Sequence, residues 1–195
     1  MGIATVITSG KGGVGKSTVA VGLGRALAQR GRRVLLVDCD AGLRSLDRMT
    51  GAEENLVFDM ADVVFARCSP AEAIYPCGGE EGLFLLPAPS LGEDFIRPGV
   101  MKKLVPLLKR YFDHVLLDSP AGVGSGFRSA AVGADRALVV CNPDPVCVRS
   151  AGTARELLQK LPVEEIRLVI NRFNGTLFHE TGAYGDLDAV IDGAG

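Results

Sequence analysis

Short, continuous runs of Val, Ile and Leu recur along this chain and alternate with segments of helical periodicity. Strands that are apolar at nearly every position, rather than at every second one, are typical of parallel sheets covered by helices on both faces. The runs predict strands over 3–8, 33–38, 83–87, 114–118, 136–141 and 166–170. The other segments predict helices over 17–30, 57–66, 98–111, 146–160 and 186–191, with a short one from residue 70. This alternation predicts an α/β fold in which a ligand binds at the carboxyl ends of the strands.

The size and composition of the chain are those of one globular domain, which we expect to span residues 1–195. With 47% hydrophobic residues the chain can bury a core, which excludes a mostly disordered protein. The net charge of −2 gives no general attraction to nucleic acid or to an anionic membrane. Residues 1–50, however, hold eight basic and three acidic side chains, so we expect an anionic ligand there.

The cysteines and the apolar runs indicate the cellular compartment of the protein. Five cysteines occur without a C-x-x-C pair, which favours buried thiols in a reducing compartment. No apolar run approaches the roughly 20 residues of a membrane span, and the N-terminal residues lack the pattern of a signal peptide. We therefore expect a cytoplasmic protein.

A glycine-rich loop joins the first predicted strand to the first helix, and we call residues 9–18 the phosphate loop. It reads, after Ser9, Gly10-Lys11-Gly12-Gly13-Val14-Gly15-Lys16-Ser17-Thr18. Glycines let the backbone wrap closely and point N–H groups at phosphate oxygens, and the helix that follows adds its positive end. Lys16 can then reach the β- and γ-phosphates, while the Ser17 hydroxyl can ligate Mg²⁺. The pattern predicts a nucleotide site at Gly10 to Thr18; the alternative is a glycine-rich turn that binds nothing.

Aspartates follow two other predicted strands. Asp38 and Asp40 come at the end of the second strand, and Asp118 ends the apolar run 115–117. Carboxylates at the carboxyl edge of the sheet, beside a phosphate loop, are suited to hold Mg²⁺ or to orient an attacking water. As isolated features they are equally consistent with surface aspartates at ordinary strand ends.

Lys11 is a second lysine inside the phosphate loop, and the loop as a whole fits K-G-G-x-G-K-[ST]. At this point the chain resembles the MinD/ParA family of P-loop ATPases. Two further segments, Gly42-Leu43-Arg44 and Ser119-Pro120-Ala121-Gly122, resemble the MinD branch of that family. The resemblance extends from residue 1 to about 191. It implies a three-layer P-loop NTPase fold, with a mainly parallel sheet flanked by helices, and ATP and Mg²⁺ as ligands.

The resemblance also implies roles for individual side chains. Lys11 is implied to cross the interface of an ATP-dependent homodimer and to act, with Lys16, on the charge of the phosphates. Asp40 is implied to position the hydrolytic water. Asp38 and Asp118 are implied to serve the metal together with Ser17, the aspartates mainly through water.

Asn171 ends the last predicted strand, where the family places an asparagine against the edge of the adenine. An amide suits this role because it offers a hydrogen-bond donor and an acceptor together. Arg172 is its expected neighbour in the base site. The alternative for Asn171 is an asparagine that serves only a turn.

The chain departs from the MinD pattern at several places. Ser45 stands where the family usually has asparagine, and Ser150 and Gly152 stand where acidic residues usually meet regulatory partners. After 186–191 no further strand and no basic amphipathic helix follow, and the last twenty residues hold four acids and no lysine or arginine. This end gives no reason to expect membrane contact; a tail in the native protein would place it at the inner face of the cell membrane.

We therefore expect a Mg²⁺-dependent ATPase that dimerises on ATP and acts as a nucleotide switch in spatial positioning, as in selection of the division site, together with protein regulators. Three alternatives stay open. A ParA-type ATPase that partitions DNA or cargo would need a basic stripe, although no specific nucleic acid is expected from the charge. An iron–sulfur scaffold would need cysteines that bridge a dimer. A nucleotide-gated binding module would hydrolyse ATP negligibly.

Overall fold

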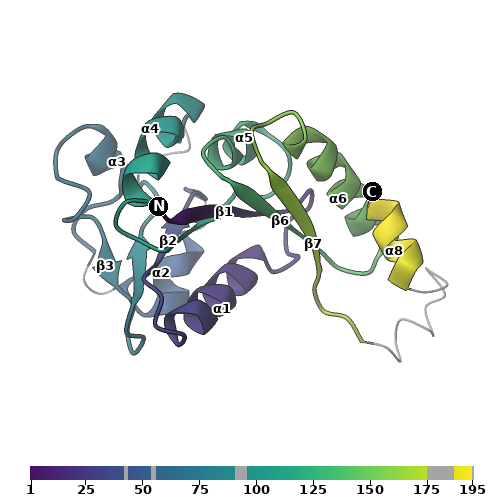
Figure 1. The fold of residues 1–195 in the computed structure, drawn as a ribbon, viewed down its shortest axis with the longest axis horizontal. Coiled ribbons are helices and arrows are strands. Elements are labelled where there is room, and N and C mark those ends of the chain that lie inside the picture. The colour runs from purple at the N-terminus through teal and green to yellow at the C-terminus, as the bar shows by residue number, and fades with distance from the viewer. Residues whose placement is uncertain (42–43, 54–55, 91–95, 175–186, 195) are drawn as a thin grey trace.

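The structure is a computed structural model that describes residues 1–41, 44–53, 56–90, 96–174 and 187–194. In this part of the chain a seven-stranded sheet lies between two layers of helices (Figure 1). The strands are β1 (Ile3–Thr8), β2 (Val34–Asp38), β3 (Tyr75–Pro76), β4 (Leu83–Leu86), β5 (His114–Asp118), β6 (Arg136–Cys141) and β7 (Glu165–Ile170). The α/β class predicted from the sequence is confirmed.

The sheet has the strand order β3-β4-β2-β5-β1-β6-β7. Every neighbouring pair is parallel except β3 and β4, which are antiparallel. Because the parallel strands run the same way, their carboxyl ends meet at one edge, where β1 lies between β5 and β6. This carboxyl edge is where the phosphate loop leaves the sheet.

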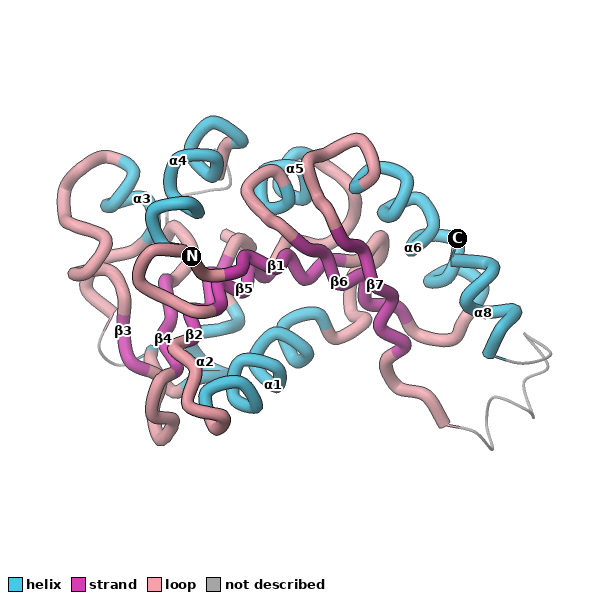
Figure 2. Tube along the Cα trace, in the orientation of Figure 1, coloured by secondary structure: helices cyan, strands magenta, loops and turns pink. Residues whose placement is uncertain are grey.

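Helices cover both faces of the sheet (Figure 2). They are α1 (Lys16–Ala28), α2 (Ser45–Thr50), α3 (Met60–Val64), α4 (Pro98–Leu108), α5 (Ser125–Ala131), α6 (Pro145–Leu158) and α8 (Leu187–Ala194). The ribbon places α1 and α2 on one face and α4, α5 and α6 on the other, while α8 packs on α6. Within the described residues, no helix is both long enough and apolar enough to span a bilayer.

The core is built from the continuous apolar runs seen in the sequence. All five residues of β2 are buried, and Leu35, Leu36 and Leu116 are at most 1% exposed. Burying such a side chain contributes about 2 kcal/mol to stability. The edge strand β7 is only partly buried. The described cysteines are all unpaired, and four of the five are buried, as expected.

Several sequence predictions need correction. No helix starts at residue 70: residues 70–73 form a turn, although Ser69 N–H and Oγ–H both donate to the Glu72 carboxylate as in a capping box. The next residues must pair with β4 as β3, so the helix cannot extend. The helix predicted over 57–66 is shorter, because Asp59 caps it by accepting from the Ala61 N–H at 2.8 Å.

The last predicted helix, over 186–191, also differs, since α8 continues past Gly193 to Ala194. Residue 186 lies outside the described residues. Three elements were not predicted: β3, α2 and α5. Each is short, and α5 has the composition Ser-Gly-Phe-Arg-Ser-Ala-Ala, which carries little apolar periodicity.

Candidate nucleotide-binding site

The backbone of the phosphate loop is shaped by glycines that no other residue can replace without strain. Gly13 and Gly15 have φ of 76° and 96°, the left-handed region that side chains with a Cβ rarely adopt. A Cβ added at Gly10 would lie 2.1 Å from the Ser150 carbonyl oxygen. The loop is therefore held tightly against the start of α6 while its backbone curves into α1.

The start of α1 leaves its backbone donors available to a ligand. Gly15 is the residue before the helix, and no described side chain caps the first turn. Uncapped N–H groups at a helix start, together with the helix dipole, form a site for an anion. A phosphate bound there would lie beside the Lys16 side chain.

Lys16 is the buried cation of the site, with 8% of the residue exposed. Burial lowers the pKa of its ammonium group, while the charges of Asp118 and Asp40 act in the opposite direction. A buried ammonium is stable only when negative charge is close. Lys16 is thus placed to exchange part of its interaction with these aspartates for the oxygens of a phosphate.

Asp118 ends β5 directly opposite Asp38 of β2 in the sheet register. Burial raises the pKa of Asp118 to about 6, although a hydrogen bond from Ser17 and the charge of Lys16 oppose this rise. Its Oδ1 atom is buried and has no hydrogen-bond partner among the described residues. An unpaired buried carboxylate oxygen beside a serine hydroxyl is a site for a cation.

These residues fit Mg²⁺. Magnesium in nucleotide sites is usually bound by one or two protein oxygens, water and the phosphates themselves. Ser17 Oγ and Asp118 Oδ1 would hold the ion, because Asp118 Oδ1 is buried without a hydrogen-bond partner among the described residues. Ser45 Oγ donates to Ser17 Oγ at 3.2 Å. The departure from asparagine at residue 45 therefore lies beside the metal site, a role that the sequence did not reveal.

Asp38 holds the segment that leads from β2 to α2. Its Oδ1 accepts from the Asp40 N–H at 2.9 Å, and its Oδ2 accepts from the Leu46 N–H at 3.3 Å. Burial raises the pKa of Asp38 to about 7, although these two hydrogen bonds oppose the rise. Asp40 is half-buried on the same segment, and Gly42 and Leu43 lie outside the described residues.

The Lys11 side chain reaches the residue that precedes α6. Its Nζ lies 3.8 Å from Asp144 Oδ1, and both side chains are more than 40% exposed. Asp144 caps α6 by accepting from the Cys147 N–H at 3.0 Å. Burial raises the pKa of Asp144, but the hydrogen bonds from Cys147 and the charge of Lys11 outweigh it, so the pKa is lowered. Sequence reasoning missed Asp144, although an aspartate before a proline is a recognisable helix start.

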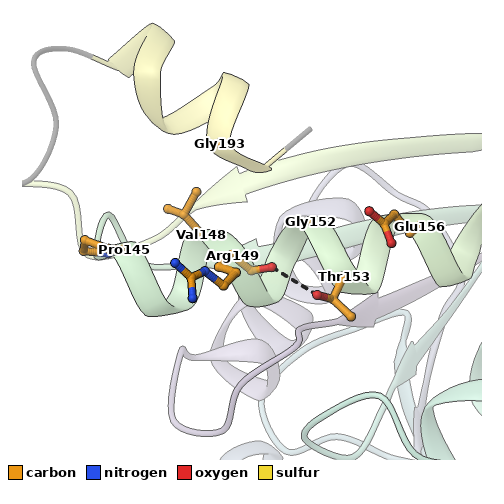
Figure 3. A pocket seen from close by; sticks show the side chains of 7 residues that line it. All are labelled: Pro145, Val148, Arg149, Gly152, Thr153, Glu156 and Gly193. Atoms are coloured by element: carbon orange, nitrogen blue, oxygen red, sulfur yellow. Dashed lines mark hydrogen bonds between the residues drawn. The ribbon is translucent and has the colours of Figure 1, made fainter.

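The outer face of α6 explains one departure from the family pattern (Figure 3). A hollow of about 400 Å³ lies on this face and is lined at its far end by Gly193 of α8. A Cβ added at Gly152 would lie 3.5 Å from the Ala194 carbonyl oxygen. That distance is an ordinary van der Waals contact, so a small side chain would fit there. A carboxylate at residue 152, however, would lie beside the carbonyl oxygens of α8, which disfavours an acidic residue.

Asn171 lies against the phosphate loop at the carboxyl end of β7. Its Nδ2 donates to the Val14 carbonyl at 2.8 Å, and a Cβ added at Gly15 would come within 2.4 Å of that nitrogen. The same side-chain amide has a second N–H hydrogen to donate, and its oxygen can accept a hydrogen bond from a base. Arg172 follows in the left-handed region with φ of 54°.

A glycine loop that joins a central parallel strand to a helix with a buried lysine at its start defines a P-loop NTPase. The profile of the CobQ/CobB/MinD/ParA nucleotide binding domain matches residues 5–183, and the chain belongs to this family.

Two curated relatives are septum site-determining proteins MinD. The protein from Bacillus subtilis (strain 168) is 42% identical over 194 residues, which cover 98% of this chain and 72% of that protein. The protein from Thermotoga maritima is 43% identical over 176 residues, which cover 89% of this chain and 65% of that protein. The chain thus spans about two thirds to three quarters of their length.

Two solved structures share the fold over nearly the whole chain. A MinC:MinD cell division protein complex from Aquifex aeolicus matches with a TM-score of 0.88 and 36% identity, covering 98% of this chain and 77% of that one. MinD from Pyrococcus horikoshii OT3, complexed with Mg-ADP, matches with a TM-score of 0.86 and 28% identity, covering 99% and 77%. The chain is accordingly an ATP hydrolase of the MinD/ParA family.

Proposed function

We propose that this chain dimerises on ATP in the presence of Mg²⁺ and acts as the nucleotide switch of a division-site selection system. The observation that carries the proposal is the exposed position of Lys11, a loop lysine whose Nζ lies 3.8 Å from the Asp144 carboxylate at the start of α6. A second copy of the chain that faces the phosphate loop would bring its nucleotide within reach of this exposed side chain. The 42% identity with a septum site-determining protein supports the cellular role.

The contact that holds Lys11 is weak enough to be exchanged. An ion pair between groups this exposed contributes about 0–1 kcal/mol. A phosphate offers Lys11 a larger negative charge in a less solvated place, so dimerisation on ATP can draw Lys11 away from Asp144 at little cost.

The proposed hydrolysis needs only positioning and charge. Lys16 and the N–H groups at the start of α1 bind the phosphates and neutralise charge on the transferred group. Lys11 of the second copy adds positive charge there as the bond to the leaving phosphate lengthens. Asp40 orients the attacking water. Bound Mg²⁺, held by Ser17 and Asp118, would neutralise charge on the β- and γ-phosphate oxygens.

Protein regulators are the partners that we propose for the ATP-bound state. The Aquifex aeolicus relative occurs in a complex with MinC. A partner of this kind would bind the dimer of this chain in preference to the monomer. We place this switch in the cytoplasm.

The decisive experiment measures mass in solution by light scattering with ATP, with ADP and with neither. We expect a dimer with ATP alone. Lys16→Ala should lose nucleotide binding, and Lys11→Ala should bind ATP yet stay monomeric and inactive, because only the charge delivered to the second copy is removed. Asp40→Ala should accumulate as an ATP dimer. Lys103→Ala, a change at an exposed lysine of α4, is the matched control.

Three results would count against the proposal. Normal turnover by Lys11→Ala would remove the role of this lysine across the interface. Normal hydrolysis by Asp40→Ala would remove the water-positioning role. A wild-type chain that binds ATP but stays monomeric at every concentration would indicate a nucleotide-gated binding module instead.

A further inference from the structure

A groove lies at the edge of the sheet opposite the phosphate loop, where β2 and β5 begin. It has a volume of about 540 Å³, and most of its lining is apolar. The larger apolar side chains belong to β4, to the segment before β3 and to the end of α4 with the residues after it: Ile74, Phe84, Leu107, Leu108, Tyr111 and Phe112. We call this feature the amino-edge groove.

The floor and the rim of the amino-edge groove differ in exposure. Leu108 and Phe112 are buried at its floor, and the ring of Phe112 packs edge to face against Phe84, with 5.5 Å between centroids. At the rim, Leu107 is 37% and Tyr111 61% exposed. Exposed large apolar side chains beside a recess of this size are typical of sites that receive an apolar side chain from a partner.

The rim is also basic. A second hollow, of about 600 Å³, shares Arg33, Tyr111 and Phe112 with the groove and is further lined by Arg32, Lys109 and Arg110. One carboxylate, Asp113, lines it, and its Oδ2 already accepts from the Arg33 backbone N–H at 2.9 Å. The basic rim therefore has an excess of positive charge.

The arginines of this rim are available to a partner. Lys109 is paired with Asp135 at 2.6 Å, but no carboxylate of the described residues forms an ion pair with Arg32, Arg33 or Arg110. The guanidinium of Arg33 is instead held over the rings of Phe84 and Phe112, at 5.9 and 5.4 Å from their centroids. Stacking on the aromatic floor keeps this charge at the groove, where its N–H groups can bind a carboxylate.

We propose that the amino-edge groove binds an acidic peptide segment of a partner protein. A bulky apolar side chain of that segment fills the recess between Ile74 and Leu108, and flanking carboxylates pair with Arg33 and Arg110. The positive charge of the rim favours an acidic partner. The recess favours a peptide over a membrane surface, because binding to a membrane needs apolar side chains that protrude together from the protein. The volume of the groove is that of sites that enclose a small ligand, enough for one or two side chains of a peptide.

This docking site is independent of ATP binding. The groove lies at the starts of β2 and β5, whereas Asp38 and Asp118 lie at their ends. Groove variants should therefore bind a fluorescent ATP analogue with wild-type affinity, which separates a failure of this proposal from a failure of the proposed switch.

The test uses three fluorescein-labelled peptides of about twelve residues, a length that crosses such a groove in extended form. The first has Asp and Glu on both sides of a central Phe-Leu pair, the second has Lys in place of the acids, and the third has Ala-Ala in place of Phe-Leu. Fluorescence anisotropy with the whole chain measures binding at low and at high salt. We expect the first peptide to bind at least tenfold more tightly than the other two, with affinity that falls as salt rises.

Two groove variants locate the binding. Arg33→Glu with Arg110→Glu should weaken the first peptide by about tenfold or more, and Tyr111→Asp should do the same by adding a charge to the rim. The matched controls are Lys160→Glu, at an exposed position two residues after α6, and Ile191→Asp, at a 48% exposed position of α8. Both controls should bind the first peptide like the wild type.

The proposal is overturned if the acidic peptide does not bind, or if the control variants weaken it as much as the groove variants do. It is also overturned if the groove variants abolish sedimentation with phosphatidylglycerol vesicles while peptide binding is unchanged. That last result would assign the arginines and Tyr111 to a lipid surface.

Discussion

Replacing Asp118 by asparagine should stabilise the nucleotide-free protein while weakening its hold on Mg²⁺. Asp118 is 1% exposed, and burial raises its pKa from 3.8 to about 6. Since one pKa unit corresponds to about 1.4 kcal/mol, the ionised carboxylate costs the folded state about 3 kcal/mol above pH 7. Asparagine carries no charge and removes that cost.

The effect should depend on pH in a defined direction. The pKa of Asp118 is higher in the folded than in the unfolded chain, so the folded state retains the proton between about pH 4 and 6, and the free energy of unfolding falls as the pH rises through this window. Asp118→Asn has no such titration. The variant should exceed the wild type in free energy of unfolding by little near pH 4 and by about 1–3 kcal/mol at pH 8. The gain is reduced towards the lower figure because Lys16 loses the opposite charge of Asp118.

Urea unfolding followed by circular dichroism, in EDTA and without nucleotide, measures this difference at the two pH values. Glu164→Gln, at an exposed carboxylate, is the control and should change little at either pH. A destabilised Asp118→Asn at pH 8, or an equal change at both pH values, would refute the argument that desolvation of Asp118 limits stability. Titration with Mg²⁺ in the presence of ADP should show a loss of metal-dependent affinity in the same variant.

Two further predictions concern the contact between Asn171 and the phosphate loop. Asn171→Ala should reduce the preference for ATP over GTP by about tenfold, since the amide that would bind the adenine edge is removed. Competition against a fluorescent nucleotide measures this preference, and an unchanged value would contradict recognition of the base by Asn171. Gly15→Ala should destabilise the protein by about 1–3 kcal/mol, because φ is 96° and the added Cβ meets Asn171 Nδ2 at 2.4 Å. Its control is Gly22→Ala in α1, where the added Cβ meets nothing within 4 Å apart from its neighbouring residues and the backbone of its own helix. Denaturant unfolding should find that variant unchanged or more stable, and equal losses in both variants would contradict the local strain.

The sequence predicted the elements whose own residues suffice to specify them. Buried parallel strands need continuous apolar runs, so β2 and β5 were recognisable without their neighbours. The phosphate loop was recognisable because glycines allow its tightly curved backbone, and that conformation depends on the residues of the loop itself. The turn at 70–73 was not, because the hydrogen bonds between Ser69 and Glu72 suit both a helix start and a turn, and pairing of β3 with β4 decides between them.

By itself, then, the sequence determined the α/β class and the residues of the phosphate loop, since periodicity and backbone freedom are properties of neighbouring residues. Only the tertiary structure decided which distant side chains meet. Pairing of β2 with β5 brings Asp38 opposite Asp118, and packing of α6 beside the loop brings Asp144 to Lys11. The raised pKa values of both strand-end aspartates follow from desolvation, and desolvation depends on everything packed around a group, not on its place in the chain.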